Sequence, residues 1–129
     1  MPVITGHYAA LLALLLFALS IKVIQARVAT RVAIGLGESG PGAIGLLRAS
    51  RAQGNFVEYV PMILVLMLLL ELSAAPAWLL HALGGMTLAG RLAHGLGITR
   101  EPEVMRLRQI GMALTFTALL VGALALLLW

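Results

Sequence analysis

Residues 56–75 read FVEYVPMILVLMLLLELSAA, and this stretch decides the fold. A helix needs about 20 mostly apolar residues to cross the hydrocarbon of a bilayer. Here the two charges, Glu58 and Glu71, stand near the two ends of the stretch. Residues 5–26, 76–98 and 109–129 form comparable apolar runs. The sequence therefore predicts an all-α protein, an integral membrane four-helix bundle that forms a single domain over residues 1–129.

The composition supports a membrane protein and excludes several other classes. Hydrophobic residues make up 61% of the 129 residues, and charged residues only 11%, against about 25% in soluble domains. The net charge is +4, but the basic residues lack interleaved aromatic side chains, which excludes nucleic-acid binding. Cysteine is absent, so any thiol used in chemistry must come from a cosubstrate.

Charge asymmetry in the connections predicts the orientation in the membrane. The first connection, residues 28–47, and the third, residues 99–108, carry arginines, whereas the turn at residues 73–76 has no Lys or Arg. The positive-inside rule makes the two basic connections cytoplasmic, so both termini are expected on the non-cytoplasmic side. Trp78 and Trp129 then fall at the far interface. The second helix is expected to begin near Ala43, before the apolar run.

Polar side chains gather at the start of the second predicted span. Residues 48, 51, 55 and 58 lie within about 80° of arc on one helix face, and they are Arg48, Arg51, Asn55 and Glu58, with Tyr59 adjacent. Arginines suit the carboxylates of an anionic ligand, and Glu58 could accept an ammonium group. The alternative is that Arg51 and Glu58 only neutralise charges on adjacent helices.

Two further groups follow along the chain. Arg91 and His94 stand at helical spacing in the third run, although a histidine there is also common as a core residue. No second His, Asp or Cys stands at ligand spacing, so no metal site is predicted. Arg106 can point inward and stabilise an anion such as a thiolate. Arg108 is better interpreted as a surface anchor.

One glycine-rich segment imitates a known motif. Residues 35–40 spell GLGESG, yet no strand precedes them as a dinucleotide-binding turn requires. Ser39 lacks the strand-turn-helix setting of a nucleophile. We interpret this segment as a loop.

Two motifs resemble a known superfamily, the membrane-associated proteins in eicosanoid and glutathione metabolism. Residues 51–61, RAQGNFVEYVP, are similar to the pattern R-x-x-x-N-x-x-E-Y-x-P of the leukotriene C synthase branch. Residues 90–94, GRLAH, resemble the G-R-V-A-H segment of the microsomal prostaglandin E synthase branch. The superfamily also contains microsomal glutathione transferases. Span number, span order and loop lengths agree over nearly the whole chain.

The resemblance implies a homotrimer that binds glutathione as cosubstrate at its subunit interfaces, towards the cytoplasmic face. By motif position it assigns the glutathione-binding residues as Arg27, Arg51, Gln53, Asn55, Glu58, Tyr59, Arg91 and His94. It assigns Arg106 the catalytic role of stabilising the glutathione thiolate. Ile98 stands where several relatives have a tyrosine, so one hydrogen bond to a ligand is missing there.

Three functions are compatible with these features. The leading hypothesis is a glutathione-dependent transferase or peroxidase in a bacterial inner membrane, acting on lipophilic small molecules that enter from the lipid bilayer. A small four-helix membrane transporter is an alternative, although the first span carries no carboxylate. The other alternative is a non-catalytic protein that binds glutathione or lipid.

Overall fold

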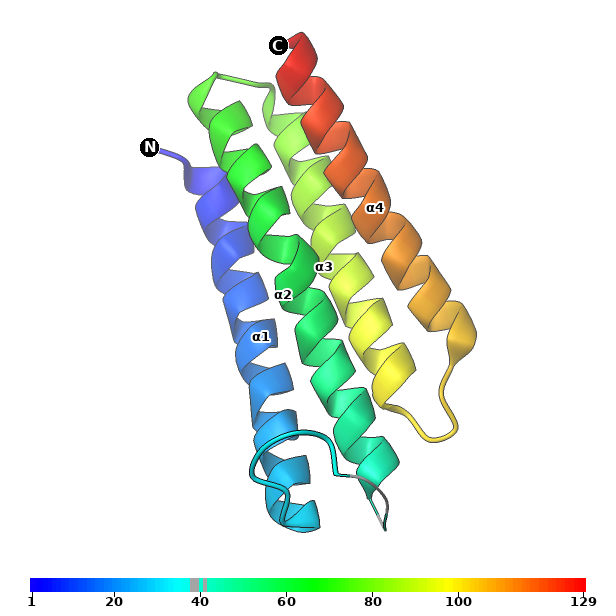
Figure 1. Ribbon diagram of the computed structural model, residues 1–129. Coiled ribbons are helices and arrows are strands. Elements are labelled where there is room, and N and C mark those ends of the chain that lie inside the picture. The colour runs from blue at the N-terminus through cyan, green and yellow to red at the C-terminus, as the bar shows by residue number, and fades with distance from the viewer. Residues whose placement is uncertain (38–39, 41) are drawn as a thin grey trace.

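The computed structural model consists of four long helices connected by one tight turn and two longer loops (Figure 1). They are α1 (Val3–Thr30), α2 (Ala43–Leu72), α3 (Ala77–Thr99) and α4 (Met105–Leu128). The structure describes residues 1–37, 40 and 42–129, and this part of the chain contains no strand. The predicted all-α, four-helix architecture is confirmed.

The helix ends follow from local backbone chemistry. Helix α1 ends at Thr30, and the next residue, Arg31, adopts a left-handed conformation and donates its N–H to the carbonyl oxygen of Val28. Helix α2 starts directly after Gly42, whose φ of 89° is accessible to glycine at little cost. Pro76 precedes α3 with an extended backbone. The expected start of the second helix near Ala43 is confirmed.

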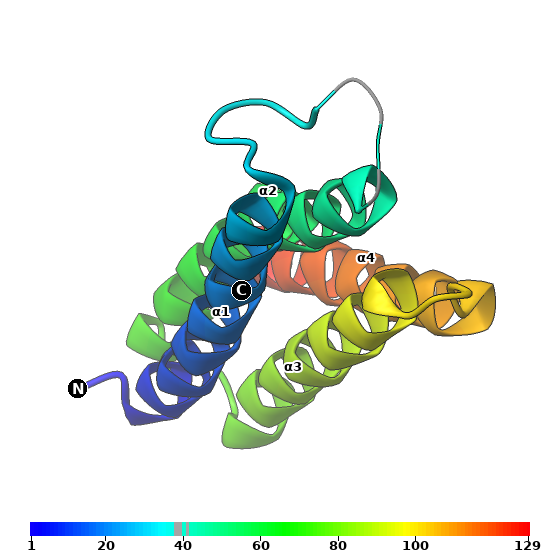
Figure 2. The same cartoon turned by 90° about the horizontal axis from the view of Figure 1, so that it is seen from below.

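Helices α2 and α3 form the centre of the bundle. Helix α2 packs against all three other helices, and α3 packs against α1 and α4, whereas α1 and α4 share no packing contact along their described lengths. Both termini and the α2–α3 turn lie at one end, and the two longer loops lie at the other (Figure 1). The view from below shows residues 32–37, which follow α1, lying outside the bundle (Figure 2).

The tryptophans lie at the end that carries the termini, as predicted. The indole Nε1 of Trp129 donates a hydrogen bond of 2.9 Å to the carbonyl oxygen of Ser73 in the α2–α3 turn. Trp78 begins α3 at the same turn and is 71% exposed. Both rings are thus available to an aromatic belt at a membrane interface.

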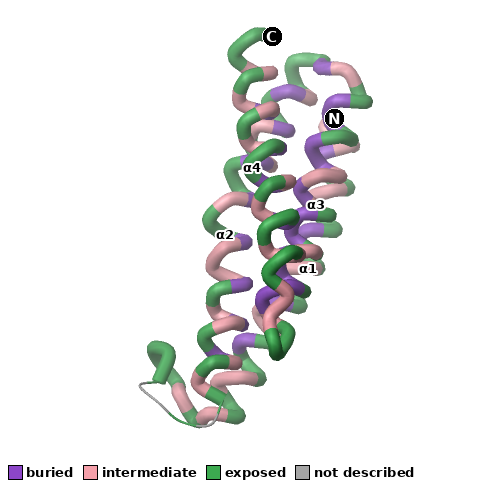
Figure 3. Tube along the Cα trace, turned by 90° about the vertical axis from the view of Figure 1, so that its right-hand side faces the viewer, coloured by how far each residue is buried: buried purple, intermediate pink, exposed green. Residues whose placement is uncertain are grey.

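Three helices, α1, α2 and α4, are long and apolar enough to cross a membrane. Helix α3 has the length of a span but falls below the other three in hydropathy. It is also the most buried helix, with eleven buried residues against four on α1 and four on α4 (Figure 3). The buried residues of α3 include Arg91 and His94, which therefore lie inside the bundle, where the other helices shield them from lipid.

The outward faces of α1 and α4 are strongly apolar. Phe17 on α1 is 65% exposed, and Leu120 and Leu127 on α4 are 60% and 81% exposed. A water-soluble protein of this size would not expose such a large contiguous apolar surface. These faces are suited to the acyl chains of a bilayer, and the chain is an integral membrane protein.

Candidate functional site

A small polar cavity lies between α2, α3 and α4 in the half of the bundle that carries the longer loops. Its volume is about 80 Å³. The lining side chains come from all three helices: Arg51, Asn55, His94, Ile98 and Arg108. The predicted groups on the second and third helices thus converge with an arginine from the fourth.

Close approach of α3 and α4 brings these residues together. A methyl group added at Gly111 would lie 2.6 Å from the carbonyl oxygen of Gly90 and 2.6 Å from the backbone nitrogen of His94. One added at Gly97 would lie 2.8 Å from the backbone nitrogen of Arg108. Because such distances exclude any side chain, the glycines allow the two backbones to touch. His94 and Arg108 consequently face the same cavity.

Arg91 lies beside this cavity without lining it. Its side chain is buried, with 2% exposure. The guanidinium donates a short hydrogen bond to Oδ1 of Asn55 and one of 3.3 Å to the carbonyl oxygen of Gly111. A third contact of 3.5 Å reaches the sulfur of Met112. No carboxylate of the described residues forms an ion pair with Arg91.

Arg51 and Glu58 pair with each other along α2. Their side chains approach to 3.4 Å, and they are 54% and 46% exposed. The interpretation that they neutralise charges on adjacent helices is therefore wrong for the described residues, since a seven-residue spacing puts them on the same face. Half-exposed charges on an apolar helix are costly in lipid, which makes this face suited to cover by another polar surface.

Tyr59 occupies the outer edge of the same region. Its ring meets Phe116 of α4 edge-on, with centroids 5.2 Å apart. Aromatic pairs favour this arrangement. Tyr59 therefore connects α2 to α4 and remains partly exposed beside the half-exposed Glu58.

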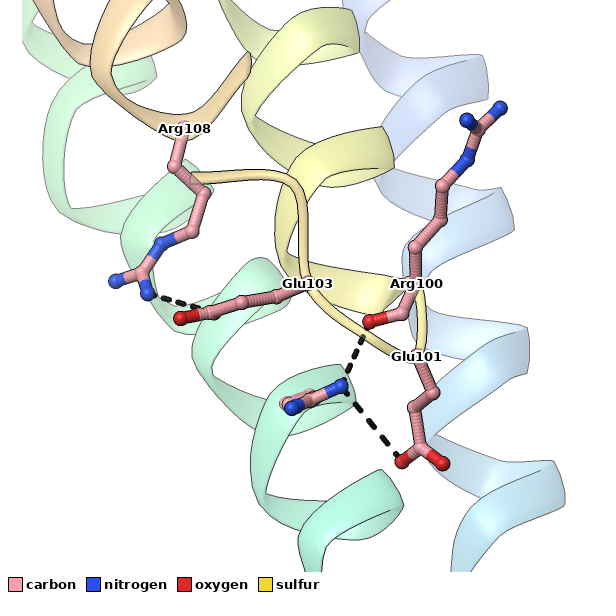
Figure 4. A network of polar contacts seen from close by, with 5 residues as sticks. Arg100, Glu101, Glu103 and Arg108 are labelled. Carbon is pink, nitrogen blue, oxygen red and sulfur yellow. Dashed lines mark hydrogen bonds and ion pairs between the residues drawn. The ribbon is translucent and has the colours of Figure 1, made fainter. Parts of the chain in front are cut away.

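Arginines and glutamates connect the α3–α4 loop to α2 and to α4 (Figure 4). Arg48 donates a hydrogen bond of 2.6 Å to the carbonyl oxygen of Arg100 and lies 3.8 Å from Glu101. Arg108 donates one of 2.8 Å to Glu103. Arg48 thus binds the α3–α4 loop and does not line the cavity, although it lies on the same helix face as Arg51.

The interpretation of Arg108 as a surface anchor is wrong. Arg108 is partly buried and lines the cavity, whereas Arg106 is exposed and does not. The physical reason is the helical rotation: residues 106 and 108 are two positions apart, so their side chains point about 200° apart around the axis of α4. Residue 108 precedes the buried Gly111 and Thr115 by three and seven residues, which puts it on their face. That spacing was a signal in the sequence that could have identified Arg108.

Two predicted ligand residues lie apart from the cavity in this chain. Arg27 donates hydrogen bonds to loop carbonyls, the shortest being 2.8 Å to Gly35. Gln53 donates one of 2.8 Å to the hydroxyl of Ser20 on α1. Arg27 therefore organises the α1–α2 loop, and Gln53 joins α1 to α2.

The described residues contain no cluster of metal ligands. Within residues 1–37, 40 and 42–129, no three His, Cys, Asp or Glu side chains gather closely enough to hold a metal ion. Ser39, which was rejected as a nucleophile, lies outside the described residues, as does part of the glycine-rich segment around it.

Comparison with known proteins places this architecture in a family. The profile of the MAPEG family matches residues 5–128. The chain belongs to the MAPEG family. It is 42% identical over 122 residues to the inner membrane protein YecN of Escherichia coli strain K12, a match that covers 95% of this chain and 88% of that protein. YecN of Escherichia coli O6:H1 matches to the same extent. No solved structure matches the chain significantly.

Proposed function

We propose that this MAPEG protein is a glutathione-dependent membrane transferase or peroxidase that acts on lipophilic electrophiles. The observation that carries the proposal is the convergence of Arg51, Asn55, His94 and Arg108 on one cavity inside an apolar bundle. Arginine and amide donors in a low-dielectric setting favour a carboxylate-bearing ligand. The chain has no cysteine, so a thiol must arrive with that ligand.

The size of the cavity supports assembly into a homotrimer. A volume of about 80 Å³ is well below the roughly 300 Å³ at which small-molecule pockets begin. The half-exposed pair Arg51 and Glu58 lies on the open face of α2. A neighbouring subunit packed against that face would enlarge the cavity into an interfacial pocket and shield the charges from lipid. Glu58 and Tyr59 would then reach the tripeptide, as the resemblance implies.

Arg27 and Gln53 can join such a pocket only from a neighbouring copy or after rearrangement. In this chain Arg27 already donates to loop carbonyl groups, and Gln53 donates to the hydroxyl of Ser20. We therefore assign the primary contacts to Arg51, Asn55 and His94, and we assign Arg27 and Gln53 to these structural contacts rather than to glutathione.

The reaction needs a stabilised thiolate. A guanidinium beside the sulfur lowers the free energy of the anion by charge and hydrogen bonding. The thiolate then forms a carbon–sulfur bond with the electrophile. In a substitution the leaving group departs with its bonding electron pair, and in an addition the π electron pair of the activated double bond moves to the neighbouring atom, which takes a proton. With a hydroperoxide, sulfur attacks the terminal oxygen, the O–O bond breaks, and the alkoxide takes a proton. The oxidised sulfur is then a sulfenic acid, and a second glutathione thiol condenses with it to give glutathione disulfide and water.

Two arginines of α4 are candidates for this role. Arg106 is the residue that the family motif indicates, but it is exposed and would act only on the site of a neighbouring subunit. Arg108 lines the cavity of its own chain, and its bond to Glu103 uses one of its five N–H donors. We assign the stabilisation of the glutathione thiolate to Arg108.

The orientation follows the charge distribution. The longer loops and their arginines lie at one end of the bundle, and the termini lie at the other. We propose that the loop end is cytoplasmic and that the membrane is a bacterial inner membrane, which is where the name of the Escherichia coli relatives puts those proteins. Glutathione would enter from the cytoplasm, and the electrophile from the lipid.

The test uses purified protein in detergent, to which glutathione is added while ultraviolet absorbance of the thiolate and the heat of binding are recorded. Arg108→Ala is compared with Arg106→Ala, the same change two residues away. Loss of a charged hydrogen bond should lower thiolate formation by about tenfold or more in Arg108→Ala, and Arg106→Ala should stay within about threefold. Absence of binding to the wild-type protein would overturn the proposal. The opposite order of the two variants would return the role to Arg106.

Turnover separates an enzyme from a binding protein. A panel of electrophiles and hydroperoxides should yield conjugates or disulfide at rates that depend on glutathione. Binding of glutathione with no turnover across the panel would leave a non-catalytic glutathione-binding protein and contradict the enzymatic part of the proposal.

A further inference from the structure

Arg91 combines deep burial with a specific partner on another helix. Its guanidinium donates to Oδ1 of Asn55, 36 residues away in the chain. A guanidinium has donors and no acceptor. Only the oxygen of the Asn55 amide can therefore face Arg91, and the amide nitrogen must point to the other side. Asn55 lines the cavity, whereas Arg91 does not.

We propose that Arg91 is a positioning residue that acts through Asn55, holding the amide so that its NH₂ group faces the cavity as a donor. This inference rests on the proposed function. It assigns the chemistry of the ligand group that meets Asn55: an acceptor, such as a carboxylate or a peptide carbonyl of glutathione. An ammonium group of the ligand cannot bind there.

The contacts of Arg91 keep it from swinging towards the ligand. The carbonyl oxygen of Gly111 and the sulfur of Met112 accept from its second terminal nitrogen. Both lie on α4, which the glycine contact between Gly90 and Gly111 brings against α3. The guanidinium is thus fixed between two helices. This differs from the role that the family resemblance implies for Arg91, which is direct contact with glutathione.

The amide orientation can be tested with a nearly isosteric change. Asn55→Asp keeps an oxygen for Arg91 but offers the ligand an anionic acceptor in place of a donor. We expect thermal stability at least equal to that of the wild type, because the charge-assisted hydrogen bond from Arg91 becomes an ion pair. We expect the dissociation constant for glutathione, measured by calorimetry, to rise by about tenfold or more. Unchanged or tighter binding would mean that the oxygen faces the ligand, and it would overturn the inference.

The coupling can be tested with a double-mutant cycle on the same dissociation constant. Asn55→Ala and Arg91→Lys should each weaken glutathione binding by about tenfold, because lysine keeps the charge but loses the planar fork. The double variant should bind no more than about twofold more weakly than the weaker single variant. Additive losses, giving about a hundredfold in the double variant, would mean that Arg91 contacts the ligand itself.

A matched control separates positioning from general destabilisation. Thr87 is fully buried on α3, one turn before Arg91, and its hydroxyl bonds only the carbonyl oxygen of Leu83. Thr87→Val should leave glutathione affinity within about twofold. If the wild-type protein binds no glutathione, the proposed function and this inference fall together. If the wild-type protein binds glutathione, but Asn55→Asp binds it as tightly as the wild type and the losses in the double-mutant cycle are additive, only the inference about Arg91 is refuted.

Discussion

The contact between Gly90 and Gly111 should make α4 intolerant of a single methyl group at one position. In Gly111→Ala the new carbon would lie 2.6 Å from the carbonyl oxygen of Gly90 and from the backbone nitrogen of His94. Ordinary van der Waals contact begins near 3.4 Å, so α4 must move away from α3 by about 0.8 Å, the difference of those two distances. Both opposing atoms belong to the backbone, and neither can rotate away.

Overpacking of this kind costs about 1–3 kcal/mol. Gly122→Ala is the matched control, because the same change on the same helix would place its carbon 3.5 Å from Leu66. At that site the higher helix propensity of alanine should stabilise the fold by up to about 1 kcal/mol.

The assay is thermal unfolding of both variants in the same detergent, followed by circular dichroism. Gly111→Ala should unfold several degrees below the wild type, and Gly122→Ala at or above it. Glutathione affinity should also fall in Gly111→Ala, because the shift removes the acceptor of Arg91 and displaces His94. Equal stability of the two variants would refute the close approach of α3 and α4.

Three other changes test contacts outside the cavity. Glu71→Gln should cost about 1 kcal/mol in thermal unfolding, because the carboxylate accepts hydrogen bonds of 2.8 Å from the two backbone amides that start α1; unchanged stability would contradict it. Gly84→Ala should destabilise the fold because its methyl group would enter the ring of Tyr8, and Tyr8→Ala in the same chain should recover part of that loss. Gln53→Ala should lower the free energy of unfolding by about 1 kcal/mol through loss of the hydrogen bond to Ser20. Glutathione affinity should change by less than about threefold, and a larger loss of affinity would mean that Gln53 contacts the ligand.

Much of the fold follows from local properties of the sequence. Apolar runs of about 20 residues predict helices of membrane-spanning length, and Gly42 and Pro76 stand beside helix starts that the structure contains. The clustering of Arg51, Asn55 and His94 could likewise be expected, since helical spacing groups residues on a face and the family motifs lie on neighbouring helices. The helices and the shared face of Arg51 and Asn55 depend on residues close together in the chain, whereas the expectation for His94 rests on the family motif of the third helix.

What only the tertiary structure decided is which face of each helix meets its neighbours. Arg106 and Arg108 point about 200° apart around α4, and the small residues Gly111 and Thr115 mark the face of Arg108 in the sequence. Only the tertiary structure shows that this face meets α3 and lines the cavity. The partner of Arg91, Asn55, is 36 residues away, and the contact depends on how α2 and α3 pack against each other. Gln53 bonds Ser20 across 33 residues for the same reason. The sequence by itself determined where the helices form and which arginines they carry. Packing between the helices decided which of these arginines line the cavity.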